Sequence, residues 1–306
     1  MARRLISRLI QLVLTSLGVA AVVFLVEYVI PGDPARMLVP RSASPTALSL
    51  VRAHLHLNDP LPTQFAHYFW GLLHGNLGAS YVQKEPVLSL IAAHLAATAV
   101  LAAAGVVVEI LVGMPLGVYA SLSHVGRRLV TVANMGLLSL PPFVLGLLLL
   151  LLFGFRLHAV PVIGGAGPSQ LILPALTLGL LGVPYYAQVV SEEMTQALAS
   201  SYVRTAVAKG VPNWRIVVRH ALKNTLPPVI TMAGLDFGIF FSGVVVVETV
   251  FGWPGIGLLA EQSVQNLDRP VVLGIALLAA VAVGVFNFLA DLMCMFLDPR
   301  TRLGIT

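Results

Sequence analysis

The stretch from His94 to Ser121, HLAATAVLAAAGVVVEILVGMPLGVYAS, contains a single charged residue, Glu109. A helix of about 20 apolar residues is long enough to cross the hydrocarbon core of a membrane. Five further runs of this kind lie at 9–30, 129–155, 171–191, 227–251 and 271–297. Of the 306 residues, 58% are hydrophobic and 10% are charged, whereas soluble domains carry about 25% charged residues. The sequence therefore predicts an all-α membrane protein with six transmembrane helices.

Basic residues indicate the orientation of these helices, because Lys and Arg are concentrated in cytoplasmic loops. If the N-terminus lies inside, twelve of the 18 basic residues fall on the inner side: Arg3, Arg4, Arg8, Arg127, Arg128, Arg204, Lys209, Arg215, Arg219, Lys223, Arg300 and Arg302. We therefore expect both termini to be cytoplasmic. The formal net charge of +5 then reflects topology, and we expect no binding to nucleic acid.

The chain divides into four parts under this interpretation. They are an N-terminal tail with the first transmembrane helix (1–30), an extracytoplasmic helical segment (31–93), a five-helix transmembrane core with a cytoplasmic segment at 199–226 (94–298), and a cytoplasmic tail (299–306). The first apolar run is too long for the apolar region of a signal peptide, so we expect an uncleaved anchor.

The segment 31–93 carries its own helix signals. Ser44 followed by Pro45 is typical of a helix N-terminus and precedes TALSLVRAHLHL. A second helix is expected over LPTQFAHYFWGLLHG, which Gly75 would end. Its aromatic residues suit either the outer membrane interface or packing against the transmembrane helices.

Five prolines lie within the predicted transmembrane helices, at positions 115, 141, 142, 174 and 184. Each removes a backbone donor and tends to kink or break a helix. Broken helices are tolerated in a membrane where they are buried in protein or line an aqueous cavity. Their number favours a transporter.

Catalytic and metal-binding motifs are absent from the sequence. It contains no GxxxxGK[ST] phosphate loop, no HExxH zinc helix and no GxSxG nucleophile elbow. Cys294 is the single cysteine, which excludes a cysteine-rich metal site. We therefore expect no enzymatic activity, cofactor or metal in this chain, and uphill transport would draw its energy from another protein.

Three acidic residues lie inside the predicted transmembrane helices: Glu109, Asp236 and Asp291. A charge at the centre of such a helix costs about 2.5 to 3.5 kcal/mol on insertion scales, so each should face protein or water. They could form a proton relay, as in a proton-coupled secondary transporter. Because no Lys or Arg of the predicted helices pairs with them, we favour a role in packing or at a subunit interface.

A basic stretch with a patch of small residues, SYVRTAVAKGVPNWRIVVRHALKNTLPP, runs from Ser201 to Pro228. Ser200 or Ser201 can cap a short helix through about Lys209, which Gly210 would end. One face of this helix would hold Tyr202, Ala206 and Gly210, with Thr205 and Lys209 beside them. Two helical turns are marginal in water, so the helix needs a docking partner.

The second half of this stretch, NWRIVVRHALKNTLPP, has the pattern of an amphipathic helix. We expect it to lie along the inner membrane interface, in contact with lipid, and to lead into the next transmembrane helix at Pro227.

Taken together, these motifs resemble the permease subunits of bacterial binding-protein-dependent ABC importers, in the branch that handles dipeptides, oligopeptides, glutathione and nickel. YVRTAVAKG stands where that family has its cytoplasmic EAA loop, with Gly210 at the glycine of the loop. Four other stretches match in the same order: PGDPA from Pro31, HLHLNDPLPTQFAHYFWGLLHGNLGASY from His54, ETVFGWPGIG from Glu248 and LDPRTR from Leu297. The resemblance covers essentially the whole chain.

The resemblance implies the fold of a type I ABC importer permease in the bacterial inner membrane. It also implies a coupling helix that inserts into a groove of a separate ATPase. The implied contacts are Tyr202, Thr205, Ala206, Lys209 and Gly210, with Arg204 at the rim. Arg204 replaces the glutamate of the general pattern, so a salt bridge of that acid cannot be transferred to this chain.

The same resemblance implies an assembly. A second homologous permease, two ATP-binding subunits that hold ATP and Mg, and an extracytoplasmic solute-binding protein would complete the importer. We expect di- or oligopeptides as solutes, with nickel, glutathione or another small solute as alternatives. A proton-coupled transporter that uses Glu109, Asp236 and Asp291 is the alternative from a different class.

Overall fold

The computed structural model describes residues 2–29, 35–36, 39, 44–54, 57–160, 167–242 and 244–297. Within these ranges every regular element is a helix, so the predicted all-α class is confirmed. Three helices are long and apolar enough to cross a membrane on their own: α5 (Val87–Leu122), α8 (Pro168–Ala199) and the part 269–290 of α14 (Arg269–Leu297).

Two further candidate spans are bent pairs of helices, each either one broken span or a re-entrant loop. The first joins α6 (His124–Leu138) to α7 (Pro142–Leu149) and the π-helical η1 (Leu150–Arg156), and the second joins α11 (Leu226–Phe241) to α12 (Val245–Phe251). Counting each pair as one span gives up to five among the described residues. The sixth predicted span corresponds to α1 (Ala2–Val29), whose apolar part at 10–26 is shorter than the others. The count of six remains a prediction.

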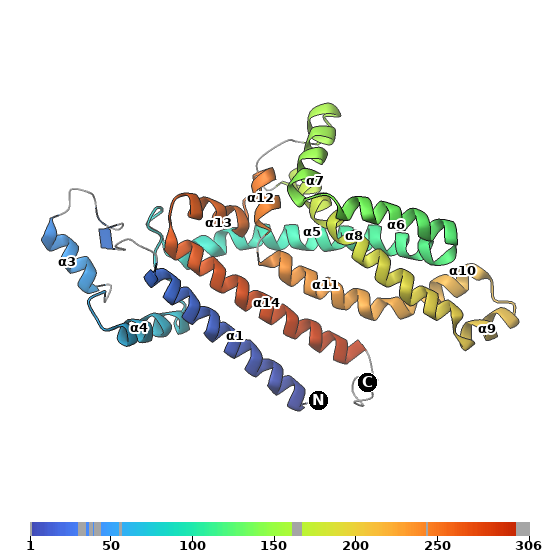
Figure 1. The fold of residues 1–306 in the computed structure, drawn as a ribbon, viewed down its shortest axis with the longest axis horizontal. Coiled ribbons are helices and arrows are strands. Elements are labelled where there is room, and N and C mark those ends of the chain that lie inside the picture. Colours follow the sequence, from blue (N-terminus) through green and yellow to red (C-terminus); the bar gives the residue numbers. More distant parts are fainter. Residues whose placement is uncertain are drawn as a thin grey trace.

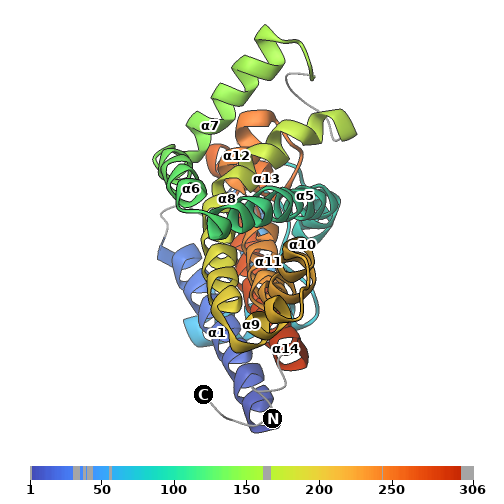
Figure 2. The same ribbon diagram turned by 90° about the vertical axis from the view of Figure 1, so that its right-hand side faces the viewer.

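The long helices α5 and α8 pack closely because glycines line their contact (Figures 1 and 2). A Cβ atom at Gly113 would lie 2.6 Å from Tyr186 Cβ, and one at Gly117 would lie 2.6 Å from the carbonyl oxygen of Ala187. Small residues at such contacts let two helix backbones approach each other within a membrane.

Single prolines do not break these two helices, and whether they kink them stays a prediction. Pro115 lies inside α5, and both Pro174 and Pro184 lie inside α8, which continues through them. Between α6 and α7 the chain bends by 100°, where Pro141 precedes Pro142 and the second proline opens a new helix. As a result α7 points away from the bundle in both views (Figures 1 and 2).

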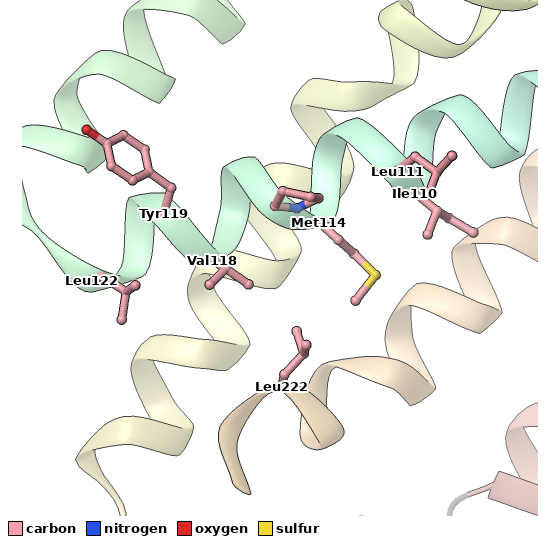
Figure 3. A pocket seen from close by; sticks show the side chains of 8 residues that line it. Ile110, Leu111, Met114, Val118, Tyr119, Leu122 and Leu222 are labelled. Atoms are coloured by element: carbon pink, nitrogen blue, oxygen red, sulfur yellow. The ribbon is translucent and has the colours of Figure 1, made fainter. Parts of the chain in front are cut away.

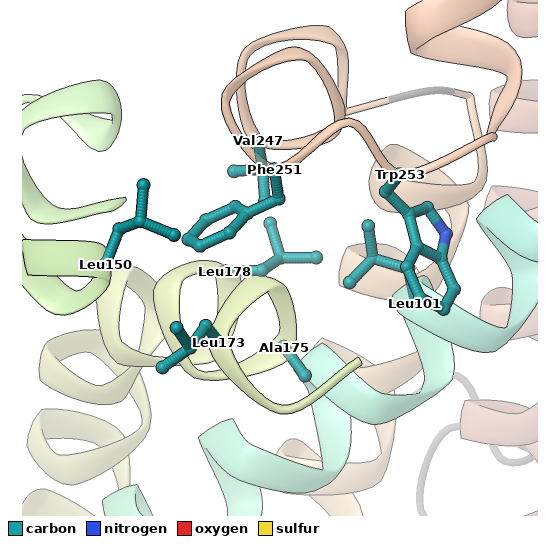
Figure 4. Close-up of a cluster of buried hydrophobic side chains, with 8 residues drawn as sticks. All are labelled: Leu101, Leu150, Leu173, Ala175, Leu178, Val247, Phe251 and Trp253. Atoms are coloured by element: carbon teal, nitrogen blue, oxygen red, sulfur yellow. The ribbon is translucent and has the colours of Figure 1, made fainter. Parts of the chain in front are cut away.

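A cluster of buried apolar side chains joins the ends of α5, α8, η1 and α12 (Figure 4). Leu101, Leu178, Phe251 and Trp253 belong to it, and Trp253 is 2% exposed. The Trp253 indole N–H donates a hydrogen bond of 2.9 Å to the carbonyl oxygen of Ala97. The polar atom of this large side chain is therefore satisfied inside the core.

The described residues between α1 and α5 include two further helices, α3 (Pro45–His54) and α4 (Leu61–Leu73). Ser44 Oγ accepts the backbone N–H of Ala47 over 3.2 Å at the start of α3, which confirms the predicted cap. The next helix, α4, is followed by Gly75 at φ +73°.

Helix α4 packs on α1, because the centre of the Phe24 ring lies 5.2 Å from the centre of the Phe65 ring and 5.5 Å from that of the Tyr68 ring. This contact favours the packed alternative over a helix that lies only at the membrane interface. After the intervening loop, α5 begins at Val87, directly after Pro86, seven residues before the predicted boundary at 94.

The two ends of the bundle differ in what they carry (Figure 1). One end holds α9 (Ser201–Ala208) and α10 (Asn213–Arg215), together with the junction between α5 and α6. The opposite end holds α3, α4 and α13 (Ile256–Gln265).

Candidate functional site

Helix α9 ends where the sequence predicts it to end. The N–H of Gly210 donates to the carbonyl of Val207 over 2.9 Å, and the N–H of Val211 donates to that of Ala206 over 3.1 Å. Gly210 itself has φ +74°. These two bonds around a left-handed glycine form a Schellman motif, which satisfies the last carbonyl groups of the helix.

The start of α9 differs from the prediction. Ser200 precedes the helix with extended backbone angles, but its hydroxyl donates to the carbonyl of Ala197 in α8 over 2.5 Å. It therefore closes α8 and does not cap α9.

The inner face of α9 packs on the chain that follows it. Val203 and Ala206 are 5% and 9% exposed and form a cluster with Ile216, to which Leu198 and Val211 add contacts. Ala206 is thus covered by its own chain, which differs from the face expected from helical spacing. The reason is that the return of the chain after Gly210 places Ile216 against this side.

The outer face of α9 is exposed and keeps the other five predicted residues together. Tyr202, Arg204, Thr205, Lys209 and Gly210 all lie on it. A Cβ atom at Gly210 would meet nothing within 4 Å.

Two exposed residues of this face, Val207 and Ala208, were missed in the sequence. Val207 is 56% exposed, and Trp214 of the next helix, α10, is 64% exposed. The guanidinium of Arg215 lies 5.2 Å from the centre of the Trp214 ring. We call the exposed set Tyr202, Arg204, Thr205, Val207, Ala208, Lys209 and Gly210 the α9 surface.

Irregular helical turns connect the α9 surface to the membrane helices. The predicted amphipathic helix consists of α10, the π-helical η2 (Ile216–Ala221) and the 3₁₀-helical η3 (Leu222–Thr225), followed by α11. Ala221 is fully buried in a cluster with Tyr186 and Val190 of α8. Asn224 Nδ2 donates to the Tyr202 hydroxyl over 2.6 Å, so η3 also touches α9 directly.

An apolar groove of about 460 Å³ lies between α5 and η3. Leu222 points toward Met114 and Val118 of α5 (Figure 3). The connecting turns therefore contact α5 as well as α8 and α11.

Two of the three predicted intramembrane acids come together. Glu109 of α5 and Asp236 of α11 lie close enough to interact electrostatically, and Tyr186 of α8 contacts both. The Tyr186 hydroxyl donates to Asp236 Oδ2 over 2.8 Å. Asp291 lies on α14, but its side chain falls outside the described residues.

A fourth acid, Glu248 of α12, is fully buried and was not among the predicted site residues. Thr98 Oγ1 of α5 donates to its Oε1 over 2.8 Å, and the backbone N–H of Leu258 donates to its Oε2 over 3.0 Å. A Cβ atom at Gly255 would overlap this carboxylate. The motif ETVFGWPGIG is therefore a loop folded around its own glutamate, and the spacing of its glycines was the signal for this arrangement.

Asp268, at the same end of the molecule, holds the loop before α5. Its carboxylate accepts the Ser80 hydroxyl and the backbone N–H of Tyr81, the latter over 2.9 Å. Both Asp268 and Ser80 are buried. Among the described residues no group of three or more His, Cys, Asp or Glu side chains is placed to hold a metal ion.

Comparison with known proteins identifies the family. Residues 110–303 match the family described as "Binding-protein-dependent transport system inner membrane component". Residues 1–102 match its N-terminal companion, "Binding-prot-dependent transport system membrane comp, N-term".

Similar proteins cover the chain from end to end. The glutathione transport system permease protein GsiC of Pectobacterium atrosepticum is 38% identical over 300 residues, which is 97% of this chain and 98% of that protein. The proteins of the same name from Salmonella typhimurium and Escherichia coli K12 are each 36% identical over 305 residues, 99% of both chains. The chain is therefore a multi-pass membrane protein of the family of ABC importer permeases, in the branch of dipeptide, oligopeptide and glutathione permeases, and is a transport component and not an enzyme.

Proposed function

We propose that this permease takes part in the import of glutathione or a closely similar short peptide. The observation that carries this proposal is the identity of 36–38% to glutathione permeases along 97–99% of the chain. Glutathione was an alternative in the sequence-based expectation, and it now has more support than the di- or oligopeptides expected first. Because glutathione is itself a tripeptide, these peptides remain the second candidate. The relatives named above give nickel no direct support.

In the proposed importer this chain forms half of the translocation pathway. A second homologous permease would form the other half, two ATP-binding subunits would hold ATP and Mg, and a solute-binding protein would deliver the solute from outside. The description of the family, which names a binding protein, supports this assembly. The absence of a phosphate loop from the sequence supports placing the ATP sites in other subunits.

The end of the bundle that carries the α9 surface would face the cytoplasm, together with both termini. This end gathers Arg127 and Arg128 at the start of α6 with Arg204, Lys209 and Arg215. The positive-inside rule supports this orientation. It leaves α3, α4 and α13 on the outer side, where a binding protein would dock.

The α9 surface would dock into a groove of the ATP-binding subunit. Its exposed small and apolar residues, Val207, Ala208 and Gly210, permit a close approach of a second surface. Its inner face is anchored through Val203, Ala206 and Ile216, and Ala221 continues the packing onto α8. A force applied to α9 would thus be transmitted to α8 and α11 through buried contacts. Such transmission is expected where a ligand of another subunit shifts the equilibrium between two conformations of this element.

A bulky side chain on the α9 surface tests whether this surface docks into the ATP-binding subunit. In proteoliposomes containing the complete importer and its binding protein, we expect Ala208→Trp to reduce ATP-driven glutathione uptake at least tenfold while the assembled permease stays folded. Ala92→Trp is the matched control, because Ala92 is also an exposed alanine and lies in the part of α5 far from α9. Normal uptake by Ala208→Trp would contradict a docking role for α9.

The solute and the energy source are tested in the same vesicles. We expect uptake of labelled glutathione to require ATP and the binding protein and to persist when the proton gradient is collapsed. Competition with unlabelled dipeptides and nickel then ranks the solutes. Uptake that follows the proton gradient without ATP would favour the secondary-transporter alternative, and transport of dipeptides without glutathione would overturn the choice of solute.

A further inference from the structure

Glu109 occupies a place built for a carboxyl group inside the helix pair. Its side chain is 1% exposed, and its Oε2 atom has no hydrogen-bond partner among the described residues. The carboxyl group lies in a notch opposite Gly182 of α8, where a Cβ atom would overlap it. Gly182 lies one helical turn before Tyr186, so the carboxyl group and the phenol share one face of α8.

The Tyr186 side chain connects this buried acid to a second one. Its hydroxyl donates to Asp236 Oδ2 over 2.8 Å, and Glu109 lies close enough to Tyr186 and Asp236 to interact with both electrostatically. Glu109, Tyr186 and Asp236 come from α5, α8 and α11, so the chain of three groups joins three helices. We call it the acid–tyrosine–acid cluster.

The hydrogen bonds of this cluster leave Glu109 without a donor for one of its oxygens. A tyrosine hydroxyl can donate only one proton, and that of Tyr186 goes to Asp236 Oδ2. An ionised carboxylate has only acceptor atoms, and Glu109 Oε2 finds no donor among the described residues. The surroundings of Glu109 therefore favour a carboxyl group that carries its own proton.

Burial favours the same conclusion. The groups that act on Glu109 are Tyr186 and Asp236, and neither can supply a positive charge. A buried carboxylate without a cationic partner is strongly disfavoured and becomes neutral when it can take up a proton. The buried Glu248 differs, because Thr98 and the backbone N–H of Leu258 donate to both of its oxygens.

We propose that the acid–tyrosine–acid cluster is a binding site for one proton, which the Glu109 carboxyl group holds beside the hydrogen bond between Tyr186 and Asp236. In the proton-bound form the neutral Glu109 fits the notch at Gly182 and stabilises the packing of α5 on α8 seen here. Exposure of Glu109 to water would allow the proton to leave, so the conformational equilibrium of these helices depends on pH. This site is independent of the solute and of the energy source of transport.

Infrared difference spectroscopy detects the proton directly. In the purified importer at neutral pH, we expect a protonated-carboxyl C=O band that shifts in D₂O and is lost in Glu109→Gln. Glu192→Gln, which changes an exposed acid of α8, should keep the band. The absence of such a band from the wild type, or its retention at full intensity in Glu109→Gln, would overturn the proposal.

Thermal stability provides a second readout. A protein that binds a proton on folding becomes less stable as pH rises. The melting temperature of the wild type should therefore fall with increasing pH through this site, and Glu109→Gln, which has the shape of the neutral acid, should flatten that dependence. Glu192→Gln should leave it unchanged. Equal slopes in the wild type and in Glu109→Gln would show that Glu109 takes up no proton. Neither readout depends on transport, so failure of the proposed function would leave this test intact.

Discussion

Gly182 shows how a single missing side chain creates room for an acid. A methyl group at this position would overlap the Glu109 carboxyl group. We expect Gly182→Ala to destabilise the protein by about 1 to 3 kcal/mol, the usual effect of overpacking a core. The melting temperature in detergent measures this loss.

Gly136→Ala is the matched control for this prediction, because nothing lies within 4 Å of the Cβ position at Gly136 in α6. The double variant Gly182→Ala with Glu109→Ala should recover part of the lost stability, since the clashing group is then gone. A Gly182→Ala protein as stable as the wild type would show that the notch is not needed.

The second prediction for a single residue concerns the contribution of Glu248 to stability. Truncation in Glu248→Ala leaves the Thr98 hydroxyl and the N–H of Leu258 without their acceptor. Each buried unsatisfied group costs about 1 to 3 kcal/mol, so the melting temperature should fall by much more than in Glu192→Ala, where the acid is exposed. Similar melting temperatures for the two variants would contradict the structural role of Glu248.

The sequence could reveal that Glu109 and Asp236 lie in apolar helices, but not that they meet. Their meeting depends on the rotation of α5, α8 and α11 about their axes, which the packing of distant residues decides. Tyr186, which joins them, is 50 positions away from Asp236 in the chain. Glu248 was overlooked as a site because its donors are a backbone N–H and a threonine of another helix.

At the level of elements, α9 is the clearest success of the sequence. Its limits of Ser201 and Ala208 agree closely with the predicted helix from Ser201 to about Lys209, because Gly210 and Pro212 act through local backbone conformation. The placement of Ala206 could not be predicted in this way, since it depends on Ile216 packing from the next element.

The end of α9 yields a prediction of its own. Gly210 has a left-handed backbone, which Asn tolerates and a β-branched residue does not. We expect Gly210→Asn to keep most ATP-driven uptake and Gly210→Val to lose it while the permease remains assembled. Since the position is open in the monomer, loss of uptake in both variants would instead indicate that the side chain itself blocks docking.

The prolines illustrate the limit of local signals. Pro115, Pro174 and Pro184 carry the same local information as Pro141, yet only the pair at 141–142 coincides with a sharp bend. Within α5 and α8 the close contact of the two helices supports a continuous backbone across each proline. Where two prolines follow each other, the second fits the first turn of a new helix.

On the scale of the whole molecule, the arrangement of the two ends permits a direct test of orientation. In a Cys294→Ser background, we expect Trp214→Cys to react with an impermeant thiol reagent only from the cytoplasmic side. Gln83→Cys should react only from the outside. Both native side chains are exposed and lie at opposite ends of the bundle. Labelling from the reverse sides would invert the proposed topology.

The hydrogen bond from Thr98 to Glu248 has a consequence for biogenesis. The two residues are 150 positions apart, so Thr98 is synthesised and inserted with α5 long before its acceptor exists. The loop that follows α12, with Trp253 and Gly255, can pack on α5 only after it has itself been synthesised. This contact therefore forms late in the synthesis of the chain, and a nascent chain stopped before Glu248 would leave the Thr98 hydroxyl without this acceptor.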